Sequence, residues 1–172
     1  VYSEFGQLWI FGEESSEIFY NSGVANNVFQ RVSGGTLDVG CIAPHSVVAL
    51  DNGFFWLSND KTVRRASSPN SQVVSPPQIV AIFEQYETVS DAVGIGYILG
   101  GKAFYELTFP SANATWLYEI STGNWVRLSS YQEYNDMDGR HRTNCICRFD
   151  NIIIAGDYEN GSIYQLDHDT YT

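Results

Sequence analysis

The sequence predicts an all-β fold made of repeated antiparallel units. Aromatic residues make up 15% of the 172 residues, and the chain has 15 glycines but a single methionine. This composition favours strands and tight turns over helices. The clearest stretch, residues 97–128, alternates short apolar runs with turn residues, as an antiparallel meander of four strands does. One such sheet cannot cover both of its own faces. The pattern therefore predicts neighbouring sheets of the same kind and a β-propeller-like architecture.

The turns within this stretch define its strands. Gly100-Gly101 ends the first strand, and Pro110, which has no amide proton to donate, interrupts pairing after the second. The expected strands are 97–99, 103–109, 115–120 and 125–128. Tyr118 and Trp125 flank the polar turn between the last two strands, so this segment resembles the end of a kelch-type propeller blade.

Three further copies of the pattern surround this unit. Their expected strands are 7–12, 18–21 and 28–32, then 47–50, 54–58 and 62–66, and finally 144–149, 152–156 and 162–166. Corresponding strands begin near residues 8, 54, 103 and 152, at intervals of 46, 49 and 49 residues. These intervals are close to the roughly 40 to 50 residues of propeller repeats. The turn at Asn160-Gly161 predicts a type I′ hairpin, in which both turn residues have positive φ.

About four blades are therefore expected within one propeller-like domain. The predicted blades are 1–40, 41–75, 88–130 and 140–172. The first is expected to lack its first strand, and the last to stop with its fourth strand barely begun. Because the chain lacks an initiator methionine, we expect it to be a fragment of a longer protein.

One segment, 76–87, follows a helical pattern instead. Ile79, Ile82, Phe83 and Tyr86 have the spacing of one helical face, and the preceding prolines suit a first helical turn. The sequence predicts a short helix inserted between the second and third blades. The helix either covers the propeller or docks a partner, and in the second case Gln78 and Glu84 are candidate partner contacts.

The charge of the chain argues against a nucleic-acid or membrane partner. The net charge is −11 and only 9 residues are basic, whereas electrostatic binding to nucleic acid needs clustered Lys and Arg. No run reaches the roughly 18 apolar residues of a membrane span. We therefore expect no sequence-specific nucleic-acid contact and no membrane contact.

The three cysteines do not predict a metal site or a disulfide framework. Cys145 and Cys147 alternate around one residue in a strand and so lie on the same face, while Cys41 is distant in sequence. A zinc site needs at least one more clustered pair of ligands. We expect buried free thiols, with no metal and no cofactor.

Catalytic residues are also not expected. Five carboxylates that lie on or beside strands could converge on a central channel: Asp38, Glu106, Glu119, Asp157 and Asp167. Their sequence spacing does not place any two at the separation that glycoside hydrolysis requires, and no sialidase-type aspartate box is present. A carbohydrate-acting or carbohydrate-binding propeller remains one alternative. A kelch-type protein-interaction module remains another, although the usual double glycine after the second strand is missing.

Several separate runs resemble the packaged-DNA stabilisation proteins of short-tailed bacteriophages, also called tail accessory factors or tail-hub proteins. The runs are LWIFGEESSEIFYNSG, DNGFFWLSND, LTFPSANATWLYEISTGNW, GRHRTNC and AGDYENGSIYQLDHDTYT. The family members are longer, so the resemblance covers their central to C-terminal part.

The resemblance implies a non-enzymatic structural protein of a phage or prophage tail. Such a protein is assembled in the cytoplasm of the bacterial host. It closes the portal channel after DNA packaging, retains the packaged DNA, and seats the tail needle and tailspikes. Its expected partners are the portal–adaptor assembly, the needle, the tailspikes and copies of itself in a ring.

The loop 131–142 is the second segment outside the blade pattern and the stronger interface candidate. It combines tyrosines with the densest basic group of an acidic chain, and Tyr and Arg are favoured at interfaces. Its candidate contact residues are Tyr131, Tyr134, Arg140, His141 and Arg142. In the alternative, Arg140 and Arg142 cap their own turn by pairing with Asp136 or Asp138.

Overall fold

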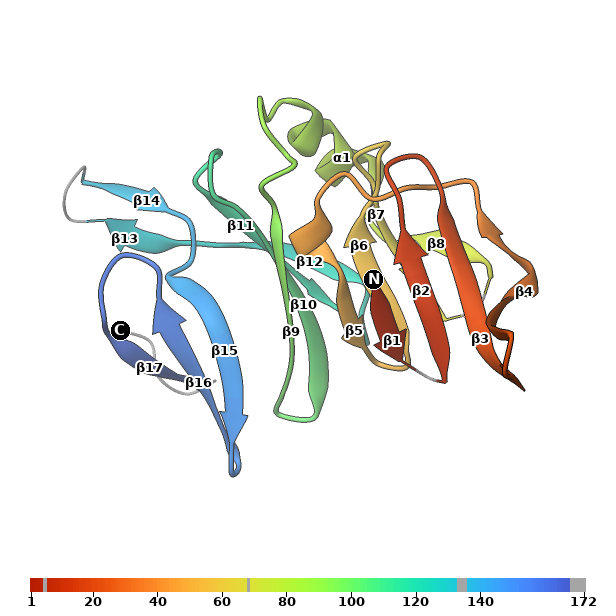
Figure 1. Ribbon diagram of the computed structural model, residues 1–172. Coiled ribbons are helices and arrows are strands. Elements are labelled where there is room, and N and C mark those ends of the chain that lie inside the picture. Colours follow the sequence, from red (N-terminus) through yellow and green to blue (C-terminus); the bar gives the residue numbers. More distant parts are fainter. Residues whose placement is uncertain (5, 68, 133–135, 168–172) are drawn as a thin grey trace.

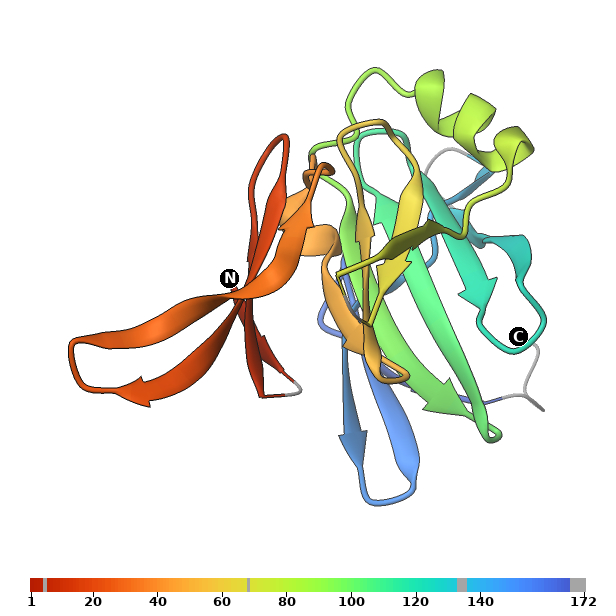
Figure 2. The same cartoon turned by 90° about the vertical axis from the view of Figure 1, so that its right-hand side faces the viewer.

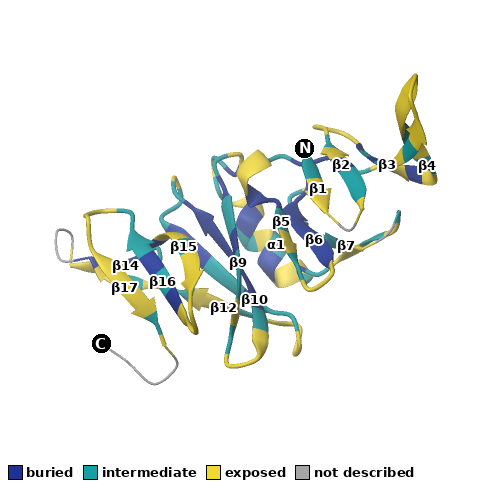
Figure 3. Ribbon diagram, turned by 60° about the horizontal axis from the view of Figure 1, so that its bottom comes forward, coloured by how far each residue is buried: buried dark blue, intermediate teal, exposed yellow. Residues whose placement is uncertain are grey.

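The computed structural model consists almost entirely of antiparallel strands (Figure 1), and it describes residues 1–4, 6–67, 69–132 and 136–167. Three four-stranded sheets follow one another along the chain, and a two-stranded hairpin and a three-stranded sheet complete it. Within each sheet the neighbouring strands are consecutive in sequence. The predicted all-β class and the antiparallel pairing are thus confirmed. The described sheets form an open row and not a closed ring (Figures 1 and 3).

The first sheet contains four strands, because a short strand precedes the three that were expected. Its strands are β1 (Tyr2–Glu4), β2 (Gln7–Phe11), β3 (Ser16–Val24) and β4 (Asn27–Leu37). The expectation of a missing first strand is wrong. β1 has only three residues, too few to show alternation, yet it pairs with β2 and places Tyr2 opposite Trp9. The hairpin of β3 and β4 extends well beyond the body of the protein (Figure 2).

The second sheet lies between the first and the third and is buried on both faces. Its strands are β5 (Val48–Leu50), β6 (Gly53–Leu57), β7 (Val63–Ala66) and β8 (Ser71–Val73), preceded by the 3-10 turn η1 (Pro44–Ser46). All five residues of β6 are buried. Since side chains alternate along a strand, Phe54 and Trp56 pack on the first sheet, while Phe55 and Leu57 pack on the third. β6 therefore joins the two clusters of the hydrophobic core.

The third sheet and the helix form the larger cluster. Its strands are β9 (Val93–Leu99), β10 (Lys102–Phe109), β11 (Ala114–Glu119) and β12 (Asn124–Leu128). The predicted helix is confirmed as α1 (Pro77–Glu84), with Ile79 and Phe83 buried. It ends before residue 87, because the amides of Gln85 and Tyr86 each bond three residues back, to the carbonyls of Ile82 and Phe83. The ring of Phe83 packs 4.8 Å from that of Phe109.

Two tryptophans of the third sheet, Trp116 and Trp125, are half-buried at the edge of this cluster. The Trp125 indole donates to the carbonyl of Val74 at 2.9 Å, and the Trp116 indole donates to the Tyr86 hydroxyl at 3.1 Å. Tyr118 and Trp125 are directly paired across β11 and β12, with ring centroids 5.1 Å apart. Both indole N–H groups thus have partners, as large aromatic side chains require when they are partly buried.

The remaining strands lie beyond the third sheet, on the side away from the second. They are β13 (Ser130–Gln132) and β14 (Met137–Gly139), which pair as a hairpin, and β15 (Thr143–Phe149), β16 (Ile152–Asp157) and β17 (Ile163–Leu166). The type I′ turn expected at Asn160-Gly161 is wrong, since neither residue has positive φ. The loop between β16 and β17 is instead wider. It is held by the side chains of Asp157 and Asn160, each of which accepts a hydrogen bond from the amide two residues later.

The cysteines are free, but only Cys41 is buried. Cys145 and Cys147 share a face, as expected, because pairing with β16 keeps the regular alternation between them. Both are exposed, so the expectation of buried thiols is wrong for these two. The reason is that their side of the last sheet has no neighbouring sheet in the described chain.

Candidate functional site

The two faces of the third sheet differ in chemistry. Tyr105 and Leu107 of β10 point toward the second sheet and belong to the hydrophobic core. Glu106 and Thr108 alternate with them and face the C-terminal strands, and both are buried. The contact between the third sheet and residues 130–142 is therefore built from polar side chains. Buried polar groups need partners within the protein.

A buried glutamate and a histidine form the centre of this contact. The Nδ1 atom of His141 lies 3.0 Å from Oε1 of Glu106, whose side chain is fully buried. The backbone amide of His141 donates to the hydroxyl of Thr115 at 3.1 Å. The second carboxylate oxygen, Oε2, has no hydrogen-bond partner among the described residues. Burial, and then the neighbouring Glu106 carboxylate, raise the pKa of the Tyr97 hydroxyl, which keeps that hydroxyl neutral.

A second group of contacts holds the hairpin of β13 and β14. The Asn113 side chain accepts from the amide of Arg140 at 3.0 Å and donates to Gln132 at 3.1 Å. Gln132 donates to the hydroxyl of Tyr158 at 2.6 Å, and the Arg140 guanidinium lies 3.6 Å from the centroid of the Tyr158 ring. Asn113 has φ of 49°, a left-handed conformation that asparagine tolerates better than most residues. This turn residue thus joins the third sheet to the C-terminal strands.

Arg142 is paired within its own chain. Its guanidinium lies 3.2 Å from carboxylate oxygens of both Asp157 and Glu159 and donates to the carbonyl of Tyr131. Desolvation would raise the pKa of Asp157. It is outweighed by hydrogen bonds from the amide of Glu159, from Arg142 and from the Tyr164 hydroxyl, and the pKa of Asp157 falls below its usual value.

The alternative in which the arginines cap their own turn is wrong. The acidic partners of Arg142 are Asp157, the last residue of β16, and Glu159 after it, and neither belongs to the loop 131–142. The Arg140 guanidinium packs on the ring of Tyr158. That alternative placed the acidic partners at Asp136 or Asp138, within the same turn as the arginines. In the fold, the paired strands β15 and β16 bring Asp157 opposite Thr143, next to Arg142.

The predicted contact residues fall on two separate surfaces. Tyr131, Arg140, His141 and Arg142 lie together at the polar contact, and Tyr131 is 53% exposed. Gln78 and Glu84 are exposed on α1, which packs on the opposite face of the third sheet. Tyr134 lies outside the described residues. That any of these residues touches a partner stays a prediction.

Sequence reasoning missed the residues that hold the contact together, which are Asn113, Thr115, Gln132 and Tyr158. Glu106 was considered only as a possible acid catalyst. A usable signal was present, since a carboxylate within an apolar strand needs a buried partner. The identity of the partner depends on tertiary structure and could not be read from spacing.

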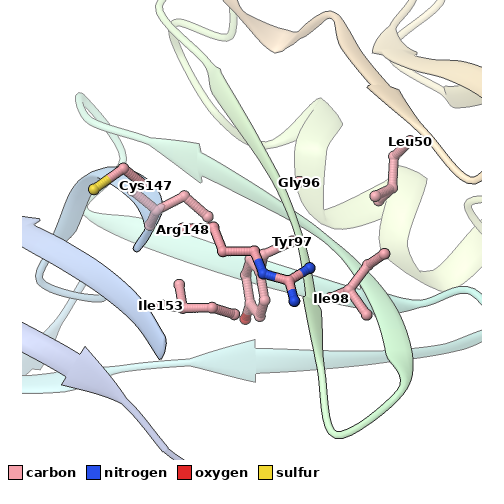
Figure 4. A pocket seen from close by; sticks show the side chains of 8 residues that line it. Leu50, Gly96, Tyr97, Ile98, Cys147, Arg148 and Ile153 are labelled. Carbon is pink, nitrogen blue, oxygen red and sulfur yellow. The ribbon is translucent and has the colours of Figure 1, made fainter. Parts of the chain in front are cut away.

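A pocket of about 290 Å³ lies between β5, β9 and the last sheet (Figure 4). Its walls are mostly apolar, with Leu50, Ile98 and Ile153 on different strands, and Arg148 is the one charged residue that lines it. The candidate acids do not gather there. Glu106 pairs with His141, Glu119 pairs with Lys102 at 2.9 Å, and Asp157 pairs with Arg142. The described pocket therefore offers no carboxylate pair for glycoside hydrolysis.

The described residues contain neither a metal-binding cluster nor a membrane-spanning helix. Within residues 1–4, 6–67, 69–132 and 136–167, no three or more His, Cys, Asp or Glu side chains gather closely enough to hold a metal ion. None of the helices in the same ranges has the length and apolar character needed to cross a membrane.

Comparison with known proteins gave one family. The family model described as bacteriophage P22 Gp10, beta-propeller, matches residues 1–171. No curated protein matched the chain. The match extends across all five sheets and across both surfaces that carry the predicted contact residues.

Proposed function

Because the chain belongs to the family of the DNA-stabilisation protein Gp10 of bacteriophage P22, we propose that it is a tail protein that closes the portal channel after DNA packaging. In this role it retains the packaged DNA inside the capsid and seats the tail needle and tailspikes. The family match over residues 1–171 is the observation that carries the proposal. The protein works as a structural part of the virion tail and is assembled in the bacterial cytoplasm.

The charge of the chain supports a plug made of protein contacts. With a net charge of −11, the chain repels the DNA phosphates and does not bind them. DNA is then held back by closing the channel, not by gripping the duplex. The partners in this role are the portal–adaptor assembly, the tail needle, the tailspikes and further copies of the chain.

The repeated sheets support a propeller as the framework of this plug. We assign the three four-stranded sheets and the sheet of β15 to β17 as four blades, which follow one another along the chain. Loops carried by a rigid framework of this kind commonly form binding surfaces. The surface around Tyr131, Arg140, His141 and Arg142 and the exposed side of α1 are the candidate contacts with other tail proteins.

The decisive experiment measures retention of DNA. Capsids assembled in host cells without this chain should package DNA and then lose it, so that the genome becomes sensitive to added nuclease. Supplying the protein during assembly should restore nuclease protection. A DNA-binding assay with the purified protein serves as the second readout and should show no retention at physiological salt. Capsids that keep their DNA equally well without the chain would refute the proposal.

A further inference from the structure

The pocket between β5, β9 and the last sheet takes its walls from three successive sheets (Figure 4). Leu50 belongs to β5, Tyr97 and Ile98 belong to β9, and Arg148 belongs to β15. These three strands are each the first strand of their own sheet. The blades of a propeller surround a central channel. Further sheets around the same axis would therefore extend the wall of this pocket and would not fill it.

The walls of the pocket are closely packed and apolar. A Cβ on Gly96 would lie 2.6 Å from a methyl carbon of Val48, so β5 and β9 approach each other as closely as a glycine allows. Ile146 and Ile153 form part of the opposite wall. The volume of about 290 Å³ is at the lower limit for ligand pockets. The space therefore suits one small organic group.

Arg148 brings a positive charge without an internal partner to this pocket. Its side chain extends from β15 toward Ile98 of β9 (Figure 4). Its Nε atom donates to the carbonyl of Asp150 at 3.3 Å, and within the described residues its two terminal nitrogens have no hydrogen bond or ion pair. Four other arginines each pair with a carboxylate, namely Arg31, Arg64, Arg65 and Arg142.

The electrostatics of the pocket favour an anion. The chain has 20 acidic residues, yet none of the described ones lines this pocket. A guanidinium binds a carboxylate through two parallel hydrogen bonds, and apolar walls strengthen such a pair by lowering the local dielectric constant. The net charge of −11 acts over longer distances, which salt screens beyond about 8 Å at physiological ionic strength.

We propose that this pocket binds a small organic anion. The apolar body of the ligand packs on Leu50, Ile98 and Ile153, and its carboxylate pairs with the terminal nitrogens of Arg148. An apolar group that ends in a carboxylate occurs as a free aliphatic acid and as the end of a protein chain whose last residue is apolar. The site goes beyond the proposed function and does not depend on it.

Isothermal titration calorimetry with octanoate as the probe tests the site. The wild-type protein should bind one octanoate per chain, whereas octylamine, which has the same apolar body and a positive charge, should not bind. Arg148→Met keeps an apolar stem but removes the guanidinium, so it should weaken octanoate binding roughly tenfold or more. The matched control is Arg127→Met, which removes the same charge from an exposed position on β12 and should bind octanoate as the wild type does.

A second variant changes the pocket wall and leaves Arg148 in place. Ile98→Asp puts a carboxylate beside the ligand and should also weaken octanoate binding. Ile98 is 56% exposed, so the fold should accept the change. Circular dichroism and urea melts establish that each variant is folded.

Two arms of the experiment distinguish the sources of the carboxylate. Octanoate represents a free aliphatic acid, and a tripeptide that ends in leucine with a free carboxylate represents the end of a protein chain. The amide of the same tripeptide should not bind. Saturable binding of either acid that Arg148→Met weakens would support the site and identify its source. Absence of binding by both acids, equal binding of octylamine, or unchanged octanoate binding in Arg148→Met would overturn the inference. None of these results bears on the proposed function, which the nuclease-protection experiment decides separately.

Discussion

Replacing His141 by alanine tests the polar contact at its centre. The variant leaves the Glu106 carboxylate, which is fully buried, without the histidine side chain that lies 3.0 Å from its Oε1 atom. Removing one partner of a buried pair costs about 3 to 5 kcal/mol in the free energy of unfolding. The histidine side chain is 22% exposed, so water can reach part of the vacated space. We therefore expect a loss near the lower limit, about 3 kcal/mol.

A double-mutant cycle separates this pair from general disruption. Glu106→Gln keeps the shape and one hydrogen bond and should cost about 1 to 2 kcal/mol. Glu106→Leu, His141→Leu and their combination form the cycle. The double variant removes both polar groups together and should cost less than His141→Leu alone. Urea unfolding followed by tryptophan fluorescence gives the free energies. A cost for His141→Ala within about 0.5 kcal/mol of zero, the range of ordinary surface substitutions, would refute the reasoning, as would purely additive effects in the cycle.

Four further outcomes follow from the described contacts. Trp125→Ala should lower the free energy of unfolding by about 2 kcal/mol, less than the roughly 3 to 5 kcal/mol expected for a fully buried aromatic residue, because the ring is half-buried. A urea melt measures this loss, with Trp125→Phe as the control. Gly40→Ala should cost at least about 2 kcal/mol, since a Cβ there would lie 1.9 Å from the carbonyl oxygen of Glu13; an unchanged melting temperature would contradict the close approach. The pKa of Asp157 is lower in the folded protein than its unfolded value of about 3.8. The carboxylate therefore stabilises the fold above pH 3.8, and this stabilisation is lost as the pH falls through the pKa of the folded state. Asp157→Asn should flatten the acid limb of a stability–pH profile. Arg142→Glu would place a third carboxylate beside Asp157 and Glu159, so charge reversal at Arg140 and Arg142 should destabilise the fold as well as disturb tail assembly. Tyr131→Ala is the cleaner assembly variant, and it should lower the yield of infectious particles while its urea melt stays that of the wild type.

The sheets of this protein were predictable because their turns are local. Gly100-Gly101 both have positive φ and join β9 to β10 in a two-residue loop, as the sequence indicates. The helical spacing of Ile79, Ile82, Phe83 and Tyr86 placed α1 correctly, since one face of so short a helix must pack on the core. Alternation and turn chemistry act within a few residues, and a single sequence contains them.

The polar contact was not predictable, because it joins residues that are distant in the chain. Glu106 and His141 are 35 positions apart, and Asn113 and Arg140 are 27 apart. No periodicity connects such pairs. The short strand β1 was missed for another reason, since three residues contain too little alternation to stand out. The wide loop at Asn160 shows that a favoured turn dipeptide yields when neighbouring side chains bond to the backbone.

The meander topology of the sheets has a consequence for how the chain acquires its structure. Each four-stranded sheet pairs only strands that are adjacent in sequence, so the loops closed during folding are short and cost little entropy. Low contact order of this kind favours rapid folding. During synthesis the first sheet can pair as soon as Leu37 has left the ribosome, and each later sheet then finds a finished surface on which to condense. The described sheets can therefore form one at a time, in the order in which they are synthesised.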